Sequence, residues 1–198
     1  DRVLAVDLHT DQLQGFFDIP VDHLPARRIF AEHLKYMGCQ GDDTVVVAPD
    51  VGGVHQAKLL ADELNSPLGI SVKRRTTPGE SDVLEVIGDF KGRRVVMIDD
   101  MIDTGGTVIK AAEKLVENGA VEVHCAATHA VLSKDAAQRL AESPIDSVIV
   151  TDTIPVPPEK MIDKLTILSV APLLADAISR IHTDSSVSAC LRNNHYRQ

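Results

Sequence analysis

The strongest chemical signal lies in residues 95–107, where an apolar run leads into the acids Asp99 and Asp100. The turn after them consists of small and hydroxyl-bearing residues, Thr104, Gly105, Gly106 and Thr107. Small residues let several backbone N–H groups converge at a helix N terminus, where the helix dipole favours an anion. The turn therefore predicts a cradle for one phosphate group. A plain strand-to-helix junction, with acids that only cap the helix, is the alternative.

The acids before the turn indicate what carries the phosphate. No lysine follows Gly106, so the turn is not the ATP loop G-x-x-x-x-G-K-[ST], and its glycines do not have the G-x-G-x-x-G spacing. Carboxylates accept hydrogen bonds from sugar hydroxyls or reach them through Mg²⁺. A ligand with both a phosphate and hydroxyls, such as a sugar phosphate, fits this pattern.

A second group of polar residues follows the first apolar run, at residues 3–6. Asp7 and His9 come at the end of this predicted strand and are expected to point the same way at period two. Asp18 and Asp22 lie further along and could add ligands for a hard cation. A structural histidine without a metal is the alternative for His9.

Two more positions could handle phosphates. Asp50 ends a predicted strand and precedes Gly52 and Gly53, so by itself it is interpreted as a helix N-cap. Lys73 and Arg75 lie beside a polar segment, residues 74–82, which is predicted to be a loop. Clustered cations next to a loop are most often a solvated surface patch.

Two of these motifs resemble a known family. Asp-Asp-Met-Ile-Asp-Thr-Gly-Gly-Thr at residues 99–107 resembles the phosphoribosyl-diphosphate loop of type I phosphoribosyltransferases and of ribose-phosphate diphosphokinases. Residues 7–22, Asp-Leu-His-Thr-Asp-Gln-Leu-Gln-Gly-Phe-Phe-Asp-Ile-Pro-Val-Asp, resemble the metal signature of the diphosphokinases across its whole length. Transferases lack this signature, so the resemblance favours the diphosphokinases.

The resemblance implies a reaction in which the C1 hydroxyl of ribose 5-phosphate attacks the β-phosphorus of Mg-ATP and AMP leaves. The product, phosphoribosyl diphosphate, serves purine, pyrimidine, NAD, histidine and tryptophan synthesis. Lys73 and Arg75 are then the catalytic residues, in a loop that closes over the phosphates. The expected ribose 5-phosphate site contains Arg75, Asp99, Asp100, Asp103, Thr104, Gly105, Gly106 and Thr107. The expected Mg²⁺ ligands are His9 and Asp50, with Asp7, Asp18 and Asp22, and a regulatory phosphate site is implied at Gln14, His23, Ser186 and Ser188.

The resemblance also sets alternatives. Family members have a further N-terminal domain and form homo-oligomers, hexamers in the family, whereas this sequence starts at Asp1 directly before a predicted strand. We therefore expect part of the enzyme to be absent. A non-catalytic regulatory relative, a phosphoribosyltransferase and a separate binding module remain open, although His9, Asp50, Lys73 and Arg75 are all present.

Alternating strands and helices must position these residues. Apolar β-branched runs predict strands at residues 3–6, 44–48, 68–72, 94–98, 122–127, 147–150 and 165–168. Helical spacing predicts helices at residues 29–37, 54–64, 108–118, 134–142 and 173–182. This order predicts an α/β fold with a parallel sheet flanked by helices, similar to type I phosphoribosyltransferases. We expect a remnant of the N-terminal domain at residues 1–24, a phosphoribosyltransferase-like domain at 25–170, and a C-terminal helix and tail at 171–198.

Composition excludes several classes of partner. The net charge of -9, with 20 Lys and Arg against 29 Asp and Glu, argues against binding to a nucleic-acid polymer. No segment has the roughly 18 consecutive apolar residues of a membrane span. The 3 cysteines are far apart and in no C-x-x-C pair, so neither disulfides nor structural zinc is indicated. A cytoplasmic location fits best.

Overall fold

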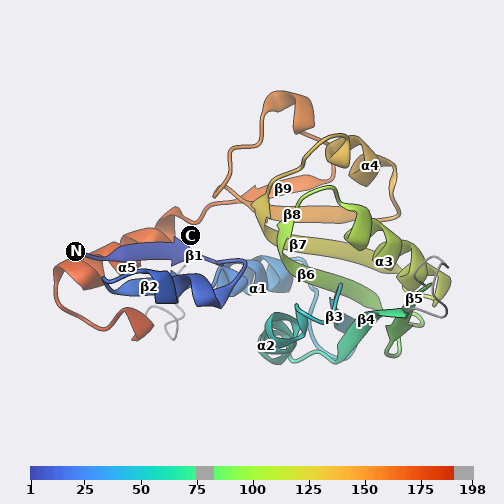
Figure 1. The fold of residues 1–198 in the computed structure, drawn as a ribbon. Coiled ribbons are helices and arrows are strands. Elements are labelled where there is room, and N and C mark those ends of the chain that lie inside the picture. The colour runs from blue at the N-terminus through green and yellow to red at the C-terminus, as the bar shows by residue number, and fades with distance from the viewer. Residues whose placement is uncertain (75–82, 190–198) are drawn as a thin grey trace.

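The computed structural model describes residues 1–74 and 83–189, and a seven-stranded sheet forms its centre (Figure 1). The strands lie in the order β5-β4-β3-β6-β7-β8-β9. They are β3 (Thr44–Ala48), β4 (Leu68–Arg74), β5 (Val83–Ile87), β6 (Arg94–Ile102), β7 (Glu122–Ala130), β8 (Ser147–Thr151) and β9 (Leu165–Leu168). Neighbouring strands are parallel, except that β5 is antiparallel to β4. The predicted α/β fold with a mainly parallel sheet is therefore confirmed.

Four helices cover the two faces of this sheet. They are α1 (Arg27–Tyr36), α2 (Val54–Leu64), α3 (Gly106–Glu117) and α4 (Ala136–Glu142). The fifth helix, α5 (Ala171–His182), packs in a separate cluster. Successive side chains of a strand point to opposite faces. Val95 and Met97 of β6 accordingly pack in the cluster that contains residues of α3 and α4. Val96 and Ile98 pack in the cluster that contains residues of α1 and α2.

A smaller unit lies beside the main sheet, where β1 (Val3–Val6) pairs in parallel with β2 (Val21–Leu24). Figure 1 shows these two strands next to α5. Leu24 of β2 and Leu173 and Ala177 of α5 form a buried cluster that includes Val187 of the 3₁₀ helix η3 (Val187–Ala189) at its edge. The segment between β1 and β2, with the 3₁₀ helix η1 (Asp11–Phe16), carries most of the predicted metal motif. The proposed domain boundaries after residues 24 and 170 stay a prediction.

The structure adds elements that the sequence pattern did not predict. The strands β2 and β5 were not expected, and β6 and β7 continue to Ile102 and Ala130, beyond the predicted ends at residues 98 and 127. The proline-rich segment at residues 155–160 contains a short 3₁₀ helix, η2 (Pro158–Lys160). Residues 75–82 of the expected loop are outside the described part. Within residues 1–74 and 83–189, no helix has both the length and the apolar character needed to cross a bilayer.

Candidate active site

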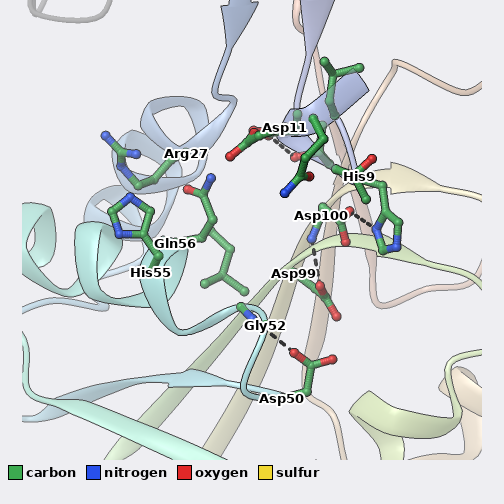
Figure 2. A pocket seen from close by; sticks show the side chains of 16 residues that line it. His9, Asp11, Arg27, Asp50, Gly52, His55, Gln56, Asp99 and Asp100 are labelled. Carbon is green, nitrogen blue, oxygen red and sulfur yellow. Dashed lines mark hydrogen bonds and ion pairs between the residues drawn. The ribbon is translucent and has the colours of Figure 1, made fainter. Parts of the chain in front are cut away.

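A pocket of about 350 Å³ lies where the carboxyl ends of β3, β6 and β7 meet the segment that follows β1. The carboxyl edge of a parallel sheet is the usual place for a ligand in such folds. Several predicted residues line this pocket together, namely Asp7, His9, Asp50, Asp99 and Asp100. Figure 2 shows His9 and Asp100 pointing toward one another, with Asp50 coming from a separate loop.

The most direct contact in the pocket joins His9 to Asp100. The Nδ1 atom of His9 lies 2.6 Å from Oδ2 of Asp100. This hydrogen bond and the negative charge of Asp100 raise the pKa of His9. Because Nδ1 faces the carboxylate, Nε2 is the ring nitrogen available to a further partner. Histidines that bind metals usually present one nitrogen while the other donates to a carboxylate in this way.

Asp99 and Asp100 are neighbours in β6, so their side chains leave opposite faces of the strand. Asp100 points toward His9, while Asp99 pairs in register with Ala127, which belongs to the α3 face of the core. Burial raises the pKa of Asp99 to about 7, and the negative charges of Asp100 and Asp50 add to this effect. The pocket is therefore a place where added negative charge is unfavourable and a cation would be stabilised.

Asp50 is exposed, and its Oδ1 atom accepts the backbone N–H of Gly53 at 3.1 Å. The interpretation of Asp50 as a helix N-cap is wrong, because Gly53 is the N-cap residue of α2 and no side chain caps this helix start. In the part of the chain that the structure describes, no three His, Cys, Asp or Glu side chains form a ready-made metal site. Mg²⁺ commonly binds through one or two carboxylates together with water and substrate phosphates. The carboxylate-rich donor set fits an ion of this kind.

The predicted phosphate cradle lies directly after β6, at the start of α3. Gly105 is the N-cap residue and has a φ of 72°, in the left-handed region that favours glycine, and no side chain caps this helix start. The first helical N–H groups have no partner within the helix and can face an anion. Gly106 and Thr107 already belong to the first turn of α3, which begins two residues earlier than predicted. Asp103 is exposed, and residues 103–107 are not part of the pocket lining.

The structure separates the three remaining acids of the predicted metal motif. Asp7 is buried and lines the pocket, but its Oδ2 atom already accepts hydrogen bonds from Ala26 N and Thr128 Oγ1. Since β1 ends at Val6, the period-two relation expected between Asp7 and His9 is wrong. Asp18 and Asp22 do not line the pocket: Asp18 is exposed, and Asp22 forms an ion pair with Arg2 at 3.3 Å.

The residues expected to bind a regulatory phosphate lie around β2 and η3. Gln14 donates to the backbone oxygen of Asp11 at 3.2 Å, and His23 Nδ1 lies 3.2 Å from the Asp11 carboxylate. The exposed residues Ser186 and Ser188 flank Val187, which packs against the cluster containing Leu24, the neighbour of His23. The described contacts therefore bring the two halves of this group to one region without forming a defined anion site.

Only one of the two predicted catalytic cations lies within the described residues. Lys73 lies near the end of β4, and its backbone pairs with Leu84 of β5. Arg75 lies outside the described residues. Their roles stay a prediction.

Sequence reasoning missed three residues next to the site. Thr128 and His129 lie near the end of β7, and both contact Asp7. Their position at the carboxyl end of a predicted parallel strand was a usable signal. Arg139 of α4 donates from Nη1 to the backbone oxygen of Thr104 at 3.0 Å, which places a guanidinium beside the cradle. Nothing in the sequence pattern of α4 indicated this contact.

Comparison with known proteins gives the same relationship over most of the chain. The family model of the phosphoribosyl synthetase-associated domain matches residues 70–192, more than half of the chain. A ribose-phosphate pyrophosphokinase of Caldanaerobacter subterraneus subsp. tengcongensis is 52% identical over 187 residues. The crystal structure of phosphoribosylpyrophosphate synthetase from Mycobacterium smegmatis is 46% identical, with a TM-score of 0.85 over 93% of this chain and 60% of that chain.

More distant structures share the fold alone. APRTase from Giardia lamblia is 14% identical, with a TM-score of 0.52 over 73% of this chain and 76% of that chain. The expected likeness to the phosphoribosyltransferase fold is therefore confirmed. The match to the Caldanaerobacter relative covers 94% of this chain but 59% of the relative, so the chain spans about three fifths of that protein. The chain belongs to the phosphoribosyl synthetase family and is a homologue of the ribose-phosphate pyrophosphokinases.

Proposed function

We propose that this chain contributes the ribose 5-phosphate side of a ribose-phosphate diphosphokinase. In the proposed reaction, the C1 hydroxyl of ribose 5-phosphate attacks the β-phosphorus of ATP, the bond from that phosphorus to the bridging α-phosphate oxygen breaks, and AMP leaves. Phosphoribosyl diphosphate is the product. In phosphoryl transfer the protein takes little part in covalent chemistry, so positioning of the substrates and stabilisation of charge supply most of the rate enhancement.

The 5-phosphate would bind at the start of α3. Thr104, Gly105, Gly106 and Thr107 would offer backbone N–H groups and two hydroxyls. Asp99 and Asp103 would accept hydrogen bonds from the ribose hydroxyls, and Asp100 would lie at the border with the ATP side. The orientation of the two side chains supports this division, because the Asp99 side chain points from β6 toward α3 and the Asp100 side chain points toward His9.

The ATP phosphates would bind on the other side of β6, together with Mg²⁺. His9 would present Nε2 to the ion because its Nδ1 atom is held by Asp100. Asp50 would add a carboxylate oxygen, and Asp18 and Asp22 would act only through a rearrangement or through water, since they do not line this pocket. When bound, the ion would neutralise the charge of the ATP phosphates.

Lys73 and Arg75 would neutralise the charge that moves with the transferring diphosphoryl group. Lys73 lies near the end of β4, and Arg75 follows this strand in the sequence; β4 is the neighbour of β3, which leads to Asp50. Closure of their segment over the phosphates would also exclude water, which otherwise competes with the ribose hydroxyl. Lys73→Ala is then expected to reduce turnover by orders of magnitude with little change in ribose 5-phosphate affinity.

The observation that carries this proposal is the meeting of His9, Asp50, Asp99 and Asp100 in one pocket, with the start of α3 following Asp99 and Asp100 a few residues later in the chain. These residues come from three separate strand ends, and each belongs to a motif that the family shares. A homo-oligomer, phosphate regulation through Gln14, His23, Ser186 and Ser188, and a cytoplasmic location belong to the same proposal. No nucleic-acid polymer or membrane is required by it.

The test is ³¹P NMR of the chain with Mg²⁺, ATP and ribose 5-phosphate, with Lys73→Ala in parallel. AMP and phosphoribosyl diphosphate formed only by the unmodified chain would support the reaction. In a second sample that contains phosphoribosyl diphosphate and a nucleobase, release of free diphosphate would indicate a transferase instead. If ribose 5-phosphate binds and no turnover occurs, the chain is the sugar-phosphate half of a site that needs further protein. If ribose 5-phosphate does not bind, the proposal fails.

A further inference from the structure

Asp7 occupies a strained and buried position directly after β1. Its φ is 38°, which is unusual for a residue with a side chain, and its exposed fraction is 9%. Its backbone N–H completes the β1–β2 ladder by donating to Leu24 O at 3.0 Å. A left-handed backbone here ends the strand and redirects the chain two residues before His9. Such strain persists only where surrounding contacts hold it.

Three contacts from distant parts of the chain hold this turn. The Oδ2 atom of Asp7 accepts from Ala26 N at 3.0 Å and from Thr128 Oγ1 at 2.6 Å. The backbone oxygen of Asp7 lies 2.9 Å from His129 Nε2. Thr128 is 1% exposed, so its hydroxyl needs a partner, and an ionised carboxylate is a strong one. The turn after β1 is thus tied to the carboxyl end of β7.

The proton positions of this network follow from the chemistry of its atoms. A carbonyl oxygen can only accept, so Nε2 of His129 must carry the proton that it shares with Asp7 O. His129 Nδ1 lies 2.9 Å from Thr153 Oγ1. The Thr153 hydroxyl also lies 3.0 Å from the backbone oxygen of Thr128, to which Thr151 donates at 2.7 Å. These contacts connect β8 to Asp7.

We propose that Asp7 is a positioning residue: its buried bonds to Thr128 and Ala26 hold the turn that directs His9 toward Asp100. One carboxylate oxygen of Asp7, Oδ2, is shared with two protein donors. Asp7 therefore acts on the pocket through His9, and Thr128 and His129 belong to the same positioning group. The inference depends on the proposed function only in that His9 is there a ligand of the cation.

Substitutions at Thr128 separate positioning from direct ligation, because Thr128 itself has no role as a ligand in this proposal. Thr128→Val removes the hydroxyl that reaches Asp7 and keeps the side-chain shape, and Thr128→Ser restores a hydroxyl. The first measurement is the ¹H–¹³C NMR signals of the His9 ring at one fixed pH without metal, assigned by their loss in His9→Gln. The second is the affinity for Mn²⁺ alone, followed by electron paramagnetic resonance.

We expect Thr128→Val to move the His9 signals and to weaken Mn²⁺ binding by about tenfold or more, because substitution of residues that support metal ligands commonly has an effect of this size. Thr128→Ser should resemble the unmodified chain. His129→Leu removes the donor to Asp7 O and provides an independent test if Thr128→Val folds poorly. The matched control is Thr44→Val, since Thr44 is also fully buried but its hydroxyl has no partner among the described residues. This variant should change neither measurement.

Two results have different meanings. If Thr128→Val and His129→Leu leave the His9 signals unchanged while Asp7→Asn abolishes Mn²⁺ binding, Asp7 is a ligand and the inference is overturned. If the unmodified chain binds no Mn²⁺ but both variants move the His9 signals, the positioning role holds and the proposed metal role of His9 fails.

Discussion

His9 Nδ1 and Asp100 Oδ2 lie 2.6 Å apart, although 91 positions separate the two residues in the sequence. This contact connects the segment after β1 to the carboxyl end of the central strand β6. It is the link through which the predicted metal motif and the predicted sugar-phosphate motif share one pocket.

Asp100→Asn should lower the pKa of His9 toward its usual value, because Asp100 raises it through a hydrogen bond and its negative charge. The measurement is an NMR titration of the His9 ring in the metal-free chain. Asp103→Asn is the control, since Asp103 is exposed and outside the pocket lining. An unchanged titration midpoint for His9 in Asp100→Asn would mean that the pair does not form in solution.

Asp99→Asn should stabilise the metal-free chain at neutral and higher pH. The pKa of Asp99 is raised from 3.8 to about 7 in the folded chain, so stability is greatest when Asp99 is protonated and is lost as the pH rises through 7. Asparagine is neutral throughout. The gain should grow from pH 4 to 7 and reach roughly 2–4 kcal/mol, at about 1.4 kcal/mol per pKa unit.

Urea unfolding in a chelator, measured at several pH values, tests this difference. A gain that is the same at pH 4 and pH 8 would show that the ionisation of Asp99 is not its cause. Added Mg²⁺ should reduce the gain if the ion offsets the carboxylate charge.

Gly105→Ala and Gly106→Ala form a matched pair at the start of α3. Gly105 has a φ of 72°, so alanine there is strained and should lower the free energy of unfolding by about 1–2 kcal/mol. No left-handed φ is recorded for Gly106, and an added Cβ would meet Arg139 Nη2 at 3.6 Å, an ordinary contact distance. Gly106→Ala should therefore fold normally. Equal losses in the two variants by thermal unfolding would contradict the backbone explanation.

Arg139→Met should weaken ribose 5-phosphate binding several-fold, because Arg139 holds the backbone oxygen of Thr104 and brings a positive charge beside the cradle. Binding can be followed by ³¹P NMR titration. Arg180→Met is the control, since Arg180 pairs with Asp176 within α5. If Arg139→Met loses stability but keeps its affinity, the contact with Thr104 serves folding alone.

The sequence predicted the main sheet well because buried parallel strands are continuous apolar runs. It failed where polar residues lie inside a strand: Asp99 and Asp100 are part of β6, and Thr128 and His129 are part of β7. β5 is an edge strand, and the hydrophobic pattern of its own residues does not predict its pairing with β4. Such pairing depends on residues distant in the sequence.

The pocket was predicted less completely than the sheet. His9 and Asp50 were expected to bind Mg²⁺ and Asp100 was expected in the ribose 5-phosphate site, and the structure brings all three to one pocket. The left-handed turn at Asp7 could not be foreseen, because aspartate rarely adopts it and the bonds that hold it come from β7 and from the residue before α1. Arg139 was missed because its side chain donates to a backbone oxygen of another segment, which the residue types do not reveal.

The opposite orientation of Asp99 and Asp100 makes the register of β6 part of the chemistry. Deleting or inserting one residue within Val95–Ile98 would exchange the faces of the two carboxylates, although the local sequence would still read Asp-Asp. The acid next to His9 would then leave the strand toward α3, and the other would leave it on the side of His9. In a relative with such a shifted strand, the same two aspartates would therefore not have the same partners.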